Sequence, residues 1–328
     1  MRAARWRCTS ARTDVKGRGV PLPRWVFPLV LTGIVVPLAM MFASKPPRKQ
    51  SSAPPGRAPV ARPAESPRSV TLTEYVKLCA DDDPTGCERA CDGGDAASCT
   101  SLGWLHEHER GRLKKDAART ATLYRRGCDG GDVLGCANLG VMFDYGRGVA
   151  KDEARAMAFY QRACDGGNAQ GCTNLGVMYD NARGGLIRDQ ARAVALYQRA
   201  CDGGHAHGCA NLGLMHEFGL GGLTKDDERA AALYRRACDR ESATGCTSLG
   251  RMYERGRGGV SKFEAGAATL YQRGCDRGDA LGCARLGRMY EDGRGDLTKD
   301  AARAAALYQQ ACDGGDDTGC ESLKHLRR

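Results

Sequence analysis

Residues 160–179 read YQRACDGGNAQGCTNLGVMY, and closely similar stretches recur along the chain. One helical pattern ends at Cys164, the run Asp165-Gly166-Gly167 predicts a turn, and a second helical pattern begins near Cys172. The first cysteine returns every 36 or 37 residues, at Cys91, Cys128, Cys164, Cys201, Cys238, Cys275 and Cys312. The second cysteine follows eight residues later each time, at Cys99, Cys136, Cys172, Cys209, Cys246, Cys283 and Cys320. Self-similarity at this period predicts a helical solenoid.

Six full units follow one another, at residues 95–131, 132–167, 168–204, 205–241, 242–278 and 279–315. A half unit, 316–328, comes after them, and residues 71–94 form an opening unit of irregular sequence. Irregular terminal units are expected in solenoids, because the first and last units have a neighbour on one side only. We therefore expect one solenoid domain over residues 71–328.

Each unit predicts two helices. In the first helix Cys136, Leu139, Met142 and Phe143 fall on one face of a 3.6-residue period. An interior glycine costs a helix about 1 kcal/mol relative to alanine, so a glycine that recurs here predicts a partner helix crossing at close range. The recurring glycines are Gly103, Gly140, Gly176, Gly213, Gly250 and Gly287. The second helix is expected to begin at capping-box sequences, which in two units are Thr224–Asp227 and Ser261–Glu264, and to point Arg155 and Arg162 outward.

The positive charge of the chain lies in its N-terminal part. Residues 1–70 hold 13 Lys/Arg against 2 Asp/Glu, whereas residues 71–328 hold 36 against 37. The repeat region therefore lacks the basic surplus that a nucleic-acid-binding domain carries, and we expect no nucleic-acid partner.

The segment before the repeats predicts three parts. Residues 1–24 are basic and expected in the cytoplasm, and the uncharged residues 25–43, WVFPLVLTGIVVPLAMMFA, are just long enough to cross the inner membrane. This segment is either a transmembrane anchor or a signal segment that is cleaved, and the absence of a clear Ala-x-Ala site favours the anchor. Residues 44–70 are rich in proline and predict a disordered linker.

The repeated pattern GCxNLGxMYxxGxG…KDxxRAAxLYxRACDGG resembles the Sel-one-like repeat, a relative of the tetratricopeptide repeat. The paired cysteines resemble one subgroup, the Helicobacter-type cysteine-rich proteins of bacterial secretion, and the match covers residues 79–328. The resemblance implies an all-α, right-handed α/α solenoid of Sel-one-like repeats. Some members of the subgroup are described as penicillin-binding or as weak β-lactam hydrolases. It therefore also implies an alternative function, the binding or weak hydrolysis of β-lactams or cell-wall fragments.

The Asp-Gly-Gly turn brings the last turn of one helix beside the first turn of the next, at a separation that a disulfide can bridge. We predict disulfides within the array, each joining cysteines eight residues apart: Cys79–Cys87, Cys91–Cys99, Cys128–Cys136, Cys164–Cys172, Cys201–Cys209, Cys238–Cys246, Cys275–Cys283 and Cys312–Cys320. The pairing among Cys79, Cys87 and Cys91 stays open, because Cys91 lies only four residues beyond Cys87. The absence of any C-x-x-C motif argues against zinc. Eight disulfides would persist only in an oxidising compartment.

Little else in the sequence suggests chemistry. His205 and His207 flank one turn and could bind a metal, but no third ligand accompanies them. His106 and His216 take a position that is aromatic in the other units, which indicates the core. The serine β-lactamase motifs S-x-x-K, S-D-N and K-T-G do not occur, and no nucleophile is accompanied by a base. We therefore assign no catalytic, cofactor-binding or metal-binding residue, expect no cofactor, and favour a protein that is not an enzyme.

One surface position of the first helix, offset from its core face, predicts a stripe along the inner, concave wall of the array. It is apolar in four units and basic in two: Trp104, Val141, Val177, Leu214, Arg251 and Arg288. Three residues earlier in each unit stand Ser101, Asn138, Asn174, Asn211, Ser248 and Arg285. Asparagine amides can hydrogen-bond a peptide backbone, so the stripe predicts a protein or peptide partner. The alternative, that these side chains tie neighbouring units together, stays open.

These expectations together describe a disulfide-stapled repeat scaffold outside the cytoplasm that binds a protein or peptide through its concave face. It would be anchored in the inner membrane through residues 25–43 with the repeats in the periplasm, or secreted if that segment is cleaved.

Overall fold

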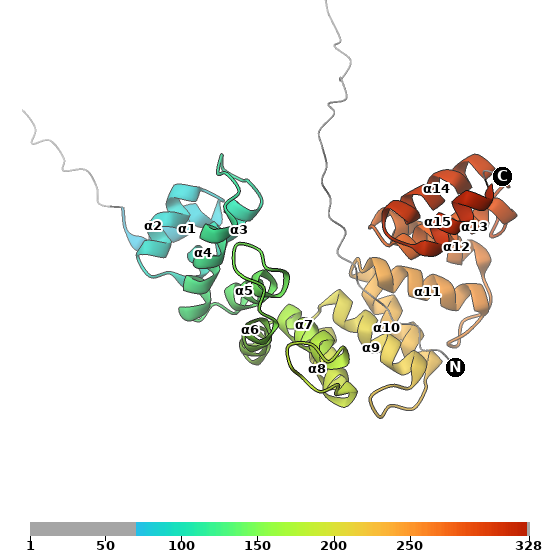
Figure 1. Ribbon diagram of the computed structural model, residues 1–328, viewed down its shortest axis with the longest axis horizontal. Helices are drawn as coiled ribbons and strands as arrows, with labels where there is room; N and C mark the ends of the chain where they lie inside the picture. The colour runs from blue at the N-terminus through green and yellow to red at the C-terminus, as the bar shows by residue number, and fades with distance from the viewer. Residues whose placement is uncertain (1–69, 327–328) are drawn as a thin grey trace, which may run out of the picture. The chain divides into compact units, whose positions relative to one another are not determined.

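The computed structural model of the protein describes residues 70–326 (Figure 1). The basic segment 1–24, the hydrophobic segment 25–43 and residues 44–69 of the linker lie outside the described residues. Among residues 70–326, no helix has both the length and the apolar character that crossing a membrane requires.

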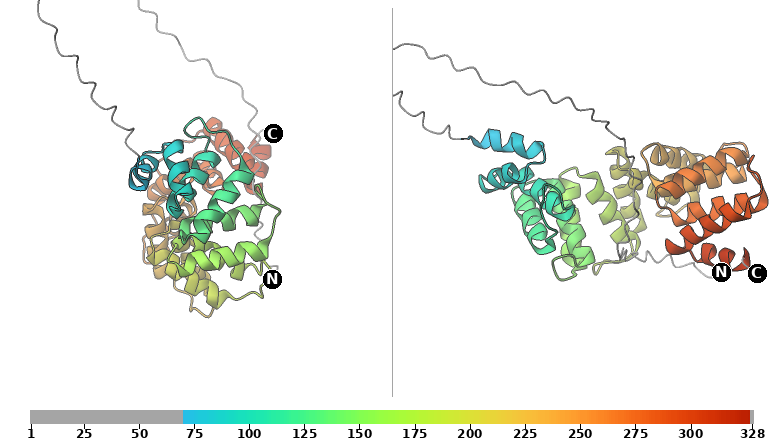
Figure 2. Two further views of the ribbon diagram at one scale, coloured as in Figure 1. Left: turned by 90° about the vertical axis from the view of Figure 1, so that its left-hand side faces the viewer. Right: turned by 90° about the horizontal axis from the view of Figure 1, so that it is seen from above.

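Within residues 70–326 the secondary structure is helical throughout, with repeating helix pairs that confirm the all-α solenoid (Figures 1 and 2). The helices are α1 (Leu72–Ala80), α2 (Pro84–Asp92), α3 (Ala96–Glu107), α4 (Ala117–Asp129), α5 (Val133–Tyr145), α6 (Glu153–Asp165), α7 (Ala169–Asp180), α8 (Gln190–Asp202), α9 (Ala206–Phe218), α10 (Asp227–Asp239), α11 (Ala243–Arg255), α12 (Glu264–Asp276), α13 (Ala280–Asp292), α14 (Ala301–Asp313) and α15 (Asp317–Leu326).

The helices form two layers. Each odd-numbered helix packs against the even-numbered helices before and after it and also against the next odd-numbered helix. Between residues 70 and 326, no even-numbered helix packs against another even-numbered helix. The odd-numbered helices therefore form the inner layer of the array, where neighbouring units come closest, and the even-numbered helices form the outer layer.

The second helix of a unit begins later than the capping-box prediction placed it. Asp226 is the N-cap of α10, and its carboxylate accepts a hydrogen bond from the backbone N–H of Arg229 at 2.8 Å. Phe263 is the N-cap residue of α12 and makes no side-chain capping bond. The prediction that Thr224 and Ser261 cap these helices is therefore wrong, because in most units an aspartate two residues further on takes that position.

The recurring glycine of the first helix does mark a close helix crossing, as predicted. A Cβ atom added at Gly140 would lie 2.6 Å from the ring of Tyr160, and at all six positions the corresponding distance to a tyrosine ring is 2.6–2.9 Å. These tyrosines are almost fully buried: Tyr124, Tyr160, Tyr197, Tyr234, Tyr271 and Tyr308. The missing side chain thus makes the space into which the largest core residue of each unit packs.

The disulfides confirm the predicted pairing, including Cys79–Cys87. All eight join cysteines eight residues apart, with Cα–Cα distances of 4.3–4.6 Å. Seven of the bonds join the end of an even-numbered helix to the start of the next odd-numbered helix, whereas Cys79–Cys87 joins the end of α1 to the start of α2. The sulfur atoms are buried in every pair except the last, in which Cys312 and Cys320 are half-buried.

Replacing both Cys164 and Cys172 by alanine should lower the free energy of unfolding by about 2–3 kcal/mol, the chain-entropy value for a loop of about nine residues. Chemical denaturation of the oxidised protein measures this loss. Free thiols at both positions in the unreduced wild-type protein, detected by mass spectrometry, would contradict the structure.

Side-chain sizes are matched where the two helices of one unit pack together. A Cβ atom at Gly127 would lie 2.2 Å from the hydroxyl oxygen of Thr100, and the same clash recurs between Gly274 and Thr247 at 2.3 Å. In the next unit the equivalent positions are both alanine, and Ala137 and Ala163 lie in one buried cluster. In these two units a threonine on the inner helix is accommodated by a glycine on the outer one, whereas Thr173 stands opposite Ala200 and its hydroxyl is bound to His205.

Gly127→Ala should lower the free energy of unfolding by about 1–3 kcal/mol, because overpacking outweighs the gain of about 1 kcal/mol in helix propensity. The double variant Thr100→Ala/Gly127→Ala recreates the alanine pair and should recover most of that loss. A double-mutant cycle from denaturation curves gives the coupling, and additive effects of the two substitutions would show that the proposed clash does not exist.

Candidate binding surface

The solvent-facing side of the inner layer is clearest on α5. Leu134, Asn138, Val141 and Tyr145 follow one another at i, i+4, i+7 and i+11, which places them on one face of the helix. Apart from Val133 at the helix start, every other residue of α5 is buried. This face is therefore the side of α5 that a partner can reach.

The equivalent positions in α3, α7, α9, α11 and α13 continue this surface, which we call the inner face. It comprises Ser101, Trp104 and His108; Asn138, Val141 and Tyr145; Asn174, Val177 and Asn181; Asn211, Leu214 and Phe218; Ser248, Arg251 and Arg255; and Arg285, Arg288 and Asp292. Trp104 and Leu214 are 38% and 41% exposed, and Val141 and Val177 are half-buried. The structure thus places the predicted stripe on one side of consecutive helices.

Two aromatic residues of the inner face were not predicted from the sequence. Tyr145 and Phe218 are 55% and 56% exposed and lie one turn after Val141 and Leu214. Arg147 lies over the Tyr145 ring at 5.1 Å, and His108 stacks on Trp104 with ring centroids 4.3 Å apart. Their spacing in the sequence could have revealed them, because each lies four residues after a residue of the predicted stripe and therefore on the same face of the helix.

The polar residues of the inner face divide into two groups. Asn211 hydrogen-bonds the hydroxyl of Tyr197, and Ser248 does the same with Tyr234, so at these positions the side chain ties neighbouring units together. Asn138 and Asn174 are half-buried, and neither has a side-chain hydrogen bond within residues 70–326. These two amides are the ones available to a partner.

The basic end of the predicted stripe is largely neutralised inside the protein. Glu217 is 2% exposed and accepts hydrogen bonds from the Tyr234 hydroxyl at 2.8 Å and from the Arg251 guanidinium at 2.6 Å. Arg285 lies 3.5 Å from the Glu254 carboxylate. Arg288 is the most exposed of the three predicted arginines, with a side chain 74% exposed, and its Nε lies 3.8 Å from the Asp292 carboxylate one turn further on.

An arginine in the loop between the two helices of one unit binds two acids of the preceding unit. The Arg183 guanidinium pairs with Asp144 on α5 and with Glu153 at the start of α6. Arg257 pairs in the same way with Glu217 and Asp227, and Arg294 with Glu254 and Glu264. In the loop between α9 and α10, which lies between the units of Arg183 and Arg257, the equivalent residue is Leu220. It packs into an apolar cluster instead.

Arg162, which we expected to point outward, illustrates a second tie between units. Its guanidinium reaches back to the carbonyl oxygen of Cys128 on the preceding outer helix. The same bond is made by Arg126, Arg199, Arg236 and Arg273 to Cys91, Cys164, Cys201 and Cys238. A cation at the carbonyl end of a helix is favourable because it opposes the negative end of the helix dipole.

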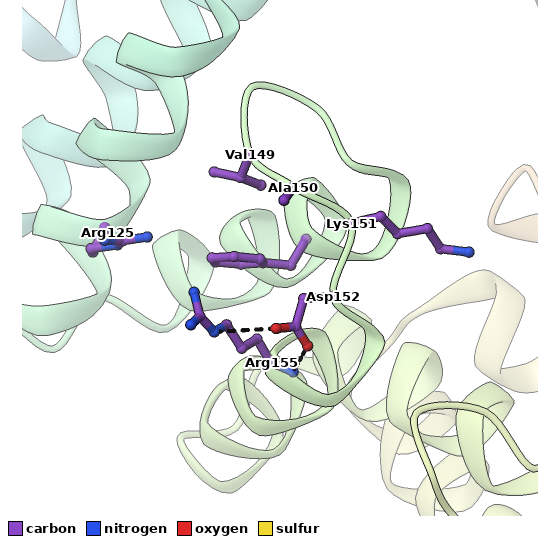
Figure 3. Close-up of a pocket in the computed structure, with 7 residues that line it drawn as sticks. Arg125, Val149, Ala150, Lys151, Asp152 and Arg155 are labelled. Carbon is purple, nitrogen blue, oxygen red and sulfur yellow. Dashed lines mark hydrogen bonds and ion pairs between the residues drawn. The ribbon is translucent and has the colours of Figure 1, made fainter.

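Two shallow notches lie away from the inner face. One, of about 370 Å³, is lined by Arg125, Phe143, Val149, Ala150, Lys151, Asp152 and Arg155 (Figure 3). The other, of about 350 Å³, occupies the corresponding place in the next unit and is lined by Gln161, Tyr179, Arg192, Ala195, Leu196 and Arg199.

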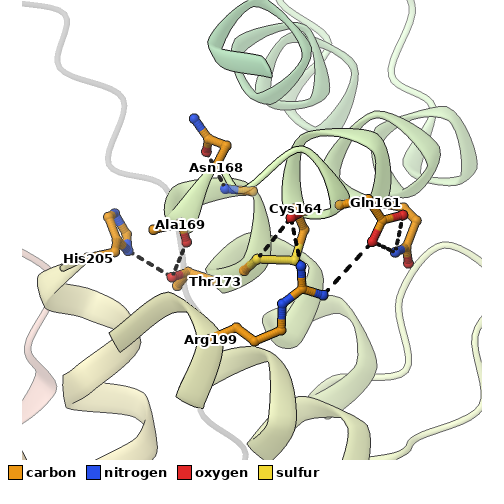
Figure 4. The surroundings of a disulfide bond; sticks show 10 residues. Gln161, Cys164, Asn168, Ala169, Thr173, Arg199 and His205 are labelled. Carbon is orange, nitrogen blue, oxygen red and sulfur yellow. Dashed lines mark hydrogen bonds and ion pairs between the residues drawn. A yellow bond between two sulfur atoms is a disulfide. The ribbon is translucent and has the colours of Figure 1, made fainter. Parts of the chain in front are cut away.

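The histidines singled out in the sequence lie in helix contacts or in the core. The Nδ1 atom of His205 lies 2.7 Å from the hydroxyl of Thr173, next to the Cys164–Cys172 disulfide (Figure 4). Burial, and next the nearby His207, lower the pKa of His205. His106 and His216 are buried, as expected of core substitutes. Among the described residues no three potential metal ligands gather, so His205 and His207 remain without a third ligand.

The Sel1 repeat family profile matches residues 96–132, 133–168, 169–205, 206–242, 243–279 and 280–316. These six matches cover most of the chain. The chain belongs to the Sel1 repeat family. This confirms the resemblance drawn from the sequence, with unit boundaries one residue later than the predicted ones. The search of curated proteins found no match.

Solved Sel1 repeat structures resemble the chain. One is c5321, a protective antigen of uropathogenic Escherichia coli with an SLR fold, at 28% identity and a TM-score of 0.58; the match covers 74% of this chain and 51% of that one, so the chain spans about half of that antigen's length. A Sel1 repeat protein from Oxalobacter formigenes matches at 20% identity and a TM-score of 0.65, covering 74% of this chain and 97% of that one. Cysteine-rich protein B of Helicobacter pylori is 29% identical, with a TM-score of 0.34, over 42% of this chain and 96% of that one.

Because of the ion pairs between loop arginines and acids of the preceding unit, the free energy of unfolding of the Sel1 array should fall at acid pH. Hydrogen bonds from Arg183, and next from Lys151, hold the pKa of Glu153 at about 2, below its ordinary value of 4.5. A carboxylate whose pKa is lower in the folded state contributes its full stability above pH 4.5 and loses it as the pH falls through about 2.

Arg183→Leu, which copies Leu220 of the next unit, should therefore lose less stability than the wild type between pH 4.5 and pH 2. Urea denaturation across this range measures the free energy of unfolding of the wild type and of the variant. In the difference between the two, the contributions of all other titrating acids cancel. Glu153→Gln should flatten the same part of the profile. Equal acid losses in the wild type and in both variants would mean that this ion pair does not couple the units.

Proposed function

We propose that the protein is a non-enzymatic binding scaffold outside the cytoplasm, and that it engages an extended protein or peptide through its inner face. The observation that carries this proposal is the row of exposed apolar and aromatic side chains on α3, α5 and α9, which the half-buried Val177 of α7 connects. Trp104, Tyr145, Leu214 and Phe218 are between 38% and 56% exposed, and large apolar side chains gathered on one surface favour a partner over solvent. Sel1 repeats with disulfides fit an interaction scaffold.

The repeat geometry supports an extended partner. The inner face offers the same set of positions once per unit, so a chain running along the array would meet an apolar contact in each of the first four units. Asn138 and Asn174 add a free amide in two successive units, and an amide can both donate to and accept from a peptide backbone. The apolar contacts end at Leu214 and Phe218, and the exposed Arg288 follows, so the face has a direction.

The disulfides support a location outside the cytoplasm, because the reducing cytosol keeps thiols free. Attachment to the inner membrane through residues 25–43, with the repeats in the periplasm, belongs to the same proposal and rests on the length and charge pattern of that segment. Cleavage of the segment would instead release the scaffold.

The enzymatic alternative has no structural support of its own. The hydroxyl of Thr173 is bound between His205 and the carbonyl of Ala169, and Thr173 is 4% exposed, so this hydroxyl–imidazole pair joins two helices and is closed to a substrate. The hydrolysis of β-lactams rests on the family resemblance alone.

Changing Val141, Val177 and Leu214 together to aspartate should abolish capture of the partner, because three charges would be buried against it. The measurement is a pull-down from the native cell envelope with the full-length oxidised protein. The matched control places three aspartates on the outer layer, at the exposed Ala158, Ala195 and Ala232, and should capture the same partner as the wild type.

Equal capture by both triple variants would overturn the inner face as the binding surface. Turnover of a chromogenic β-lactam that disappears with a single serine, threonine or histidine substitution would refute the non-enzymatic assignment. Turnover that no such substitution affects would point to a contaminant.

A further inference from the structure

The notch beside α6 gathers more positive charge than its own acids neutralise. Arg125 comes from α4, Lys151 and Asp152 from the loop before α6, and Arg155 from the first turn of α6 (Figure 3). The guanidinium carbons of Arg125 and Arg155 lie 5.9 Å and 5.6 Å from the centre of the Phe143 ring. The two guanidiniums are therefore held around one ring at the same notch.

The acids near this notch are already engaged. The Asp152 carboxylate lies 3.2 Å from Nε of Arg155 and also caps α6. Glu153 binds both Arg183 and Lys151. Asp129, one turn after Arg125 on α4, pairs with Arg162.

None of these acids pairs with Arg125. Its guanidinium contacts the Phe143 ring, and within residues 70–326 no carboxylate or carbonyl oxygen binds it. A guanidinium has five N–H donors and recognises oxyanions through them. The notch therefore holds an unused donor group.

The same position elsewhere in the array is satisfied from within. Arg235 on α10 is the equivalent of Arg125, and it donates to the hydroxyl of Tyr253 at 3.3 Å. Gln161 and Gln198, the equivalents in the two units after α4, each bind an aspartate one turn further on. The notch beside α6 differs from all of these. It has Arg125 where two other units have a glutamine, and it has Phe143, which lacks a hydroxyl, where Tyr253 binds Arg235.

We propose that this notch binds the phosphate group of a small ligand. Arg125 would supply the free guanidinium, Arg155 would lie beside it at the same ring, and Val149 and the exposed Ala150 would contact the apolar group that carries the phosphate. Charge-assisted bonds from arginine to phosphate are among the stronger hydrogen bonds in proteins. The volume of about 370 Å³ fits a small organic phosphate.

The site is separate from the inner face. Phe143 stands two residues from both Val141 and Tyr145, so on a helix it points to the other side of α5. A ligand in the notch and a partner on the inner face therefore bind without contacting each other, and the site does not rest on the proposed scaffold function.

The test is isothermal titration of the full-length oxidised protein with inorganic phosphate and with phenyl phosphate, at constant salt. The wild type should bind both, with phenyl phosphate tighter if the apolar wall takes part. Arg125→Gln, which copies Gln161, should weaken binding about tenfold or more, as expected for the loss of a charged hydrogen bond. Phe143→Tyr should also weaken it, because the new hydroxyl would occupy Arg125 as Tyr253 occupies Arg235.

Arg235→Gln is the matched control, since it removes the same charge from the equivalent position on α10, where the arginine is already bound to Tyr253, and it should leave the affinity unchanged. Circular dichroism and thermal melting show whether each variant is folded. Wild-type affinity in Arg125→Gln, equal weakening by Arg235→Gln, or no binding of either probe would overturn the proposal. The Val141/Val177/Leu214 aspartate variant should bind phosphate normally, which separates this test from that of the inner face.

Discussion

A covalent bond across each turn sets how one unit follows the next. From Cys91–Cys99 onward the sulfur bridge holds the end of an outer helix to the start of the following inner helix, with Cα atoms 4.4–4.6 Å apart. In the core between the helices each unit buries a leucine, a tyrosine and in most cases a methionine, and the remaining core positions are small alanines and glycines that bury little apolar area. The bridges reduce the conformational entropy of the unfolded chain where apolar burial is modest. The regular stack of the inner helices, and with it the inner face, depends on this tie.

Polar contacts between units then complete the alignment. Buried tyrosine hydroxyls donate to acids at the ends of the inner helices, as Tyr234 does to Glu217, and burial raises the pKa of Tyr234 so that it stays a donor. Loop arginines such as Arg257 bind the same acids from the next unit. Breaking such a pair leaves a charge buried without its partner, which is why the contacts specify one arrangement of neighbouring units. The side chains left over on the solvent side are mostly apolar.

The sequence predicted the features that repeat with the period and missed those that depend on a neighbouring unit. The period, the glycine at the helix crossing and the cysteine pairing were all predictable, because each follows from residues within about one unit, as Gly140 and Tyr160 show. The neutralisation of Arg251 was not predictable, because Glu217 lies 34 residues earlier and belongs to the preceding unit. Tyr145 and Phe218 were not predictable from the repeat, because the other units carry polar residues at this position, such as Asn181 and Arg255. The N-cap at Asp226 was missed because the loop packs Leu223 into the core and delays the helix.

The last disulfide differs from the others in one respect. No hairpin covers α15 within the described residues, and Cys312 and Cys320 are therefore half-buried, whereas the other sulfurs are enclosed. A thiolate can exchange with a disulfide only where it reaches a sulfur atom. Chemical reduction would thus begin at the carboxyl-terminal hairpin, far along the chain from Trp104 and Tyr145, whose neighbouring bridges are enclosed.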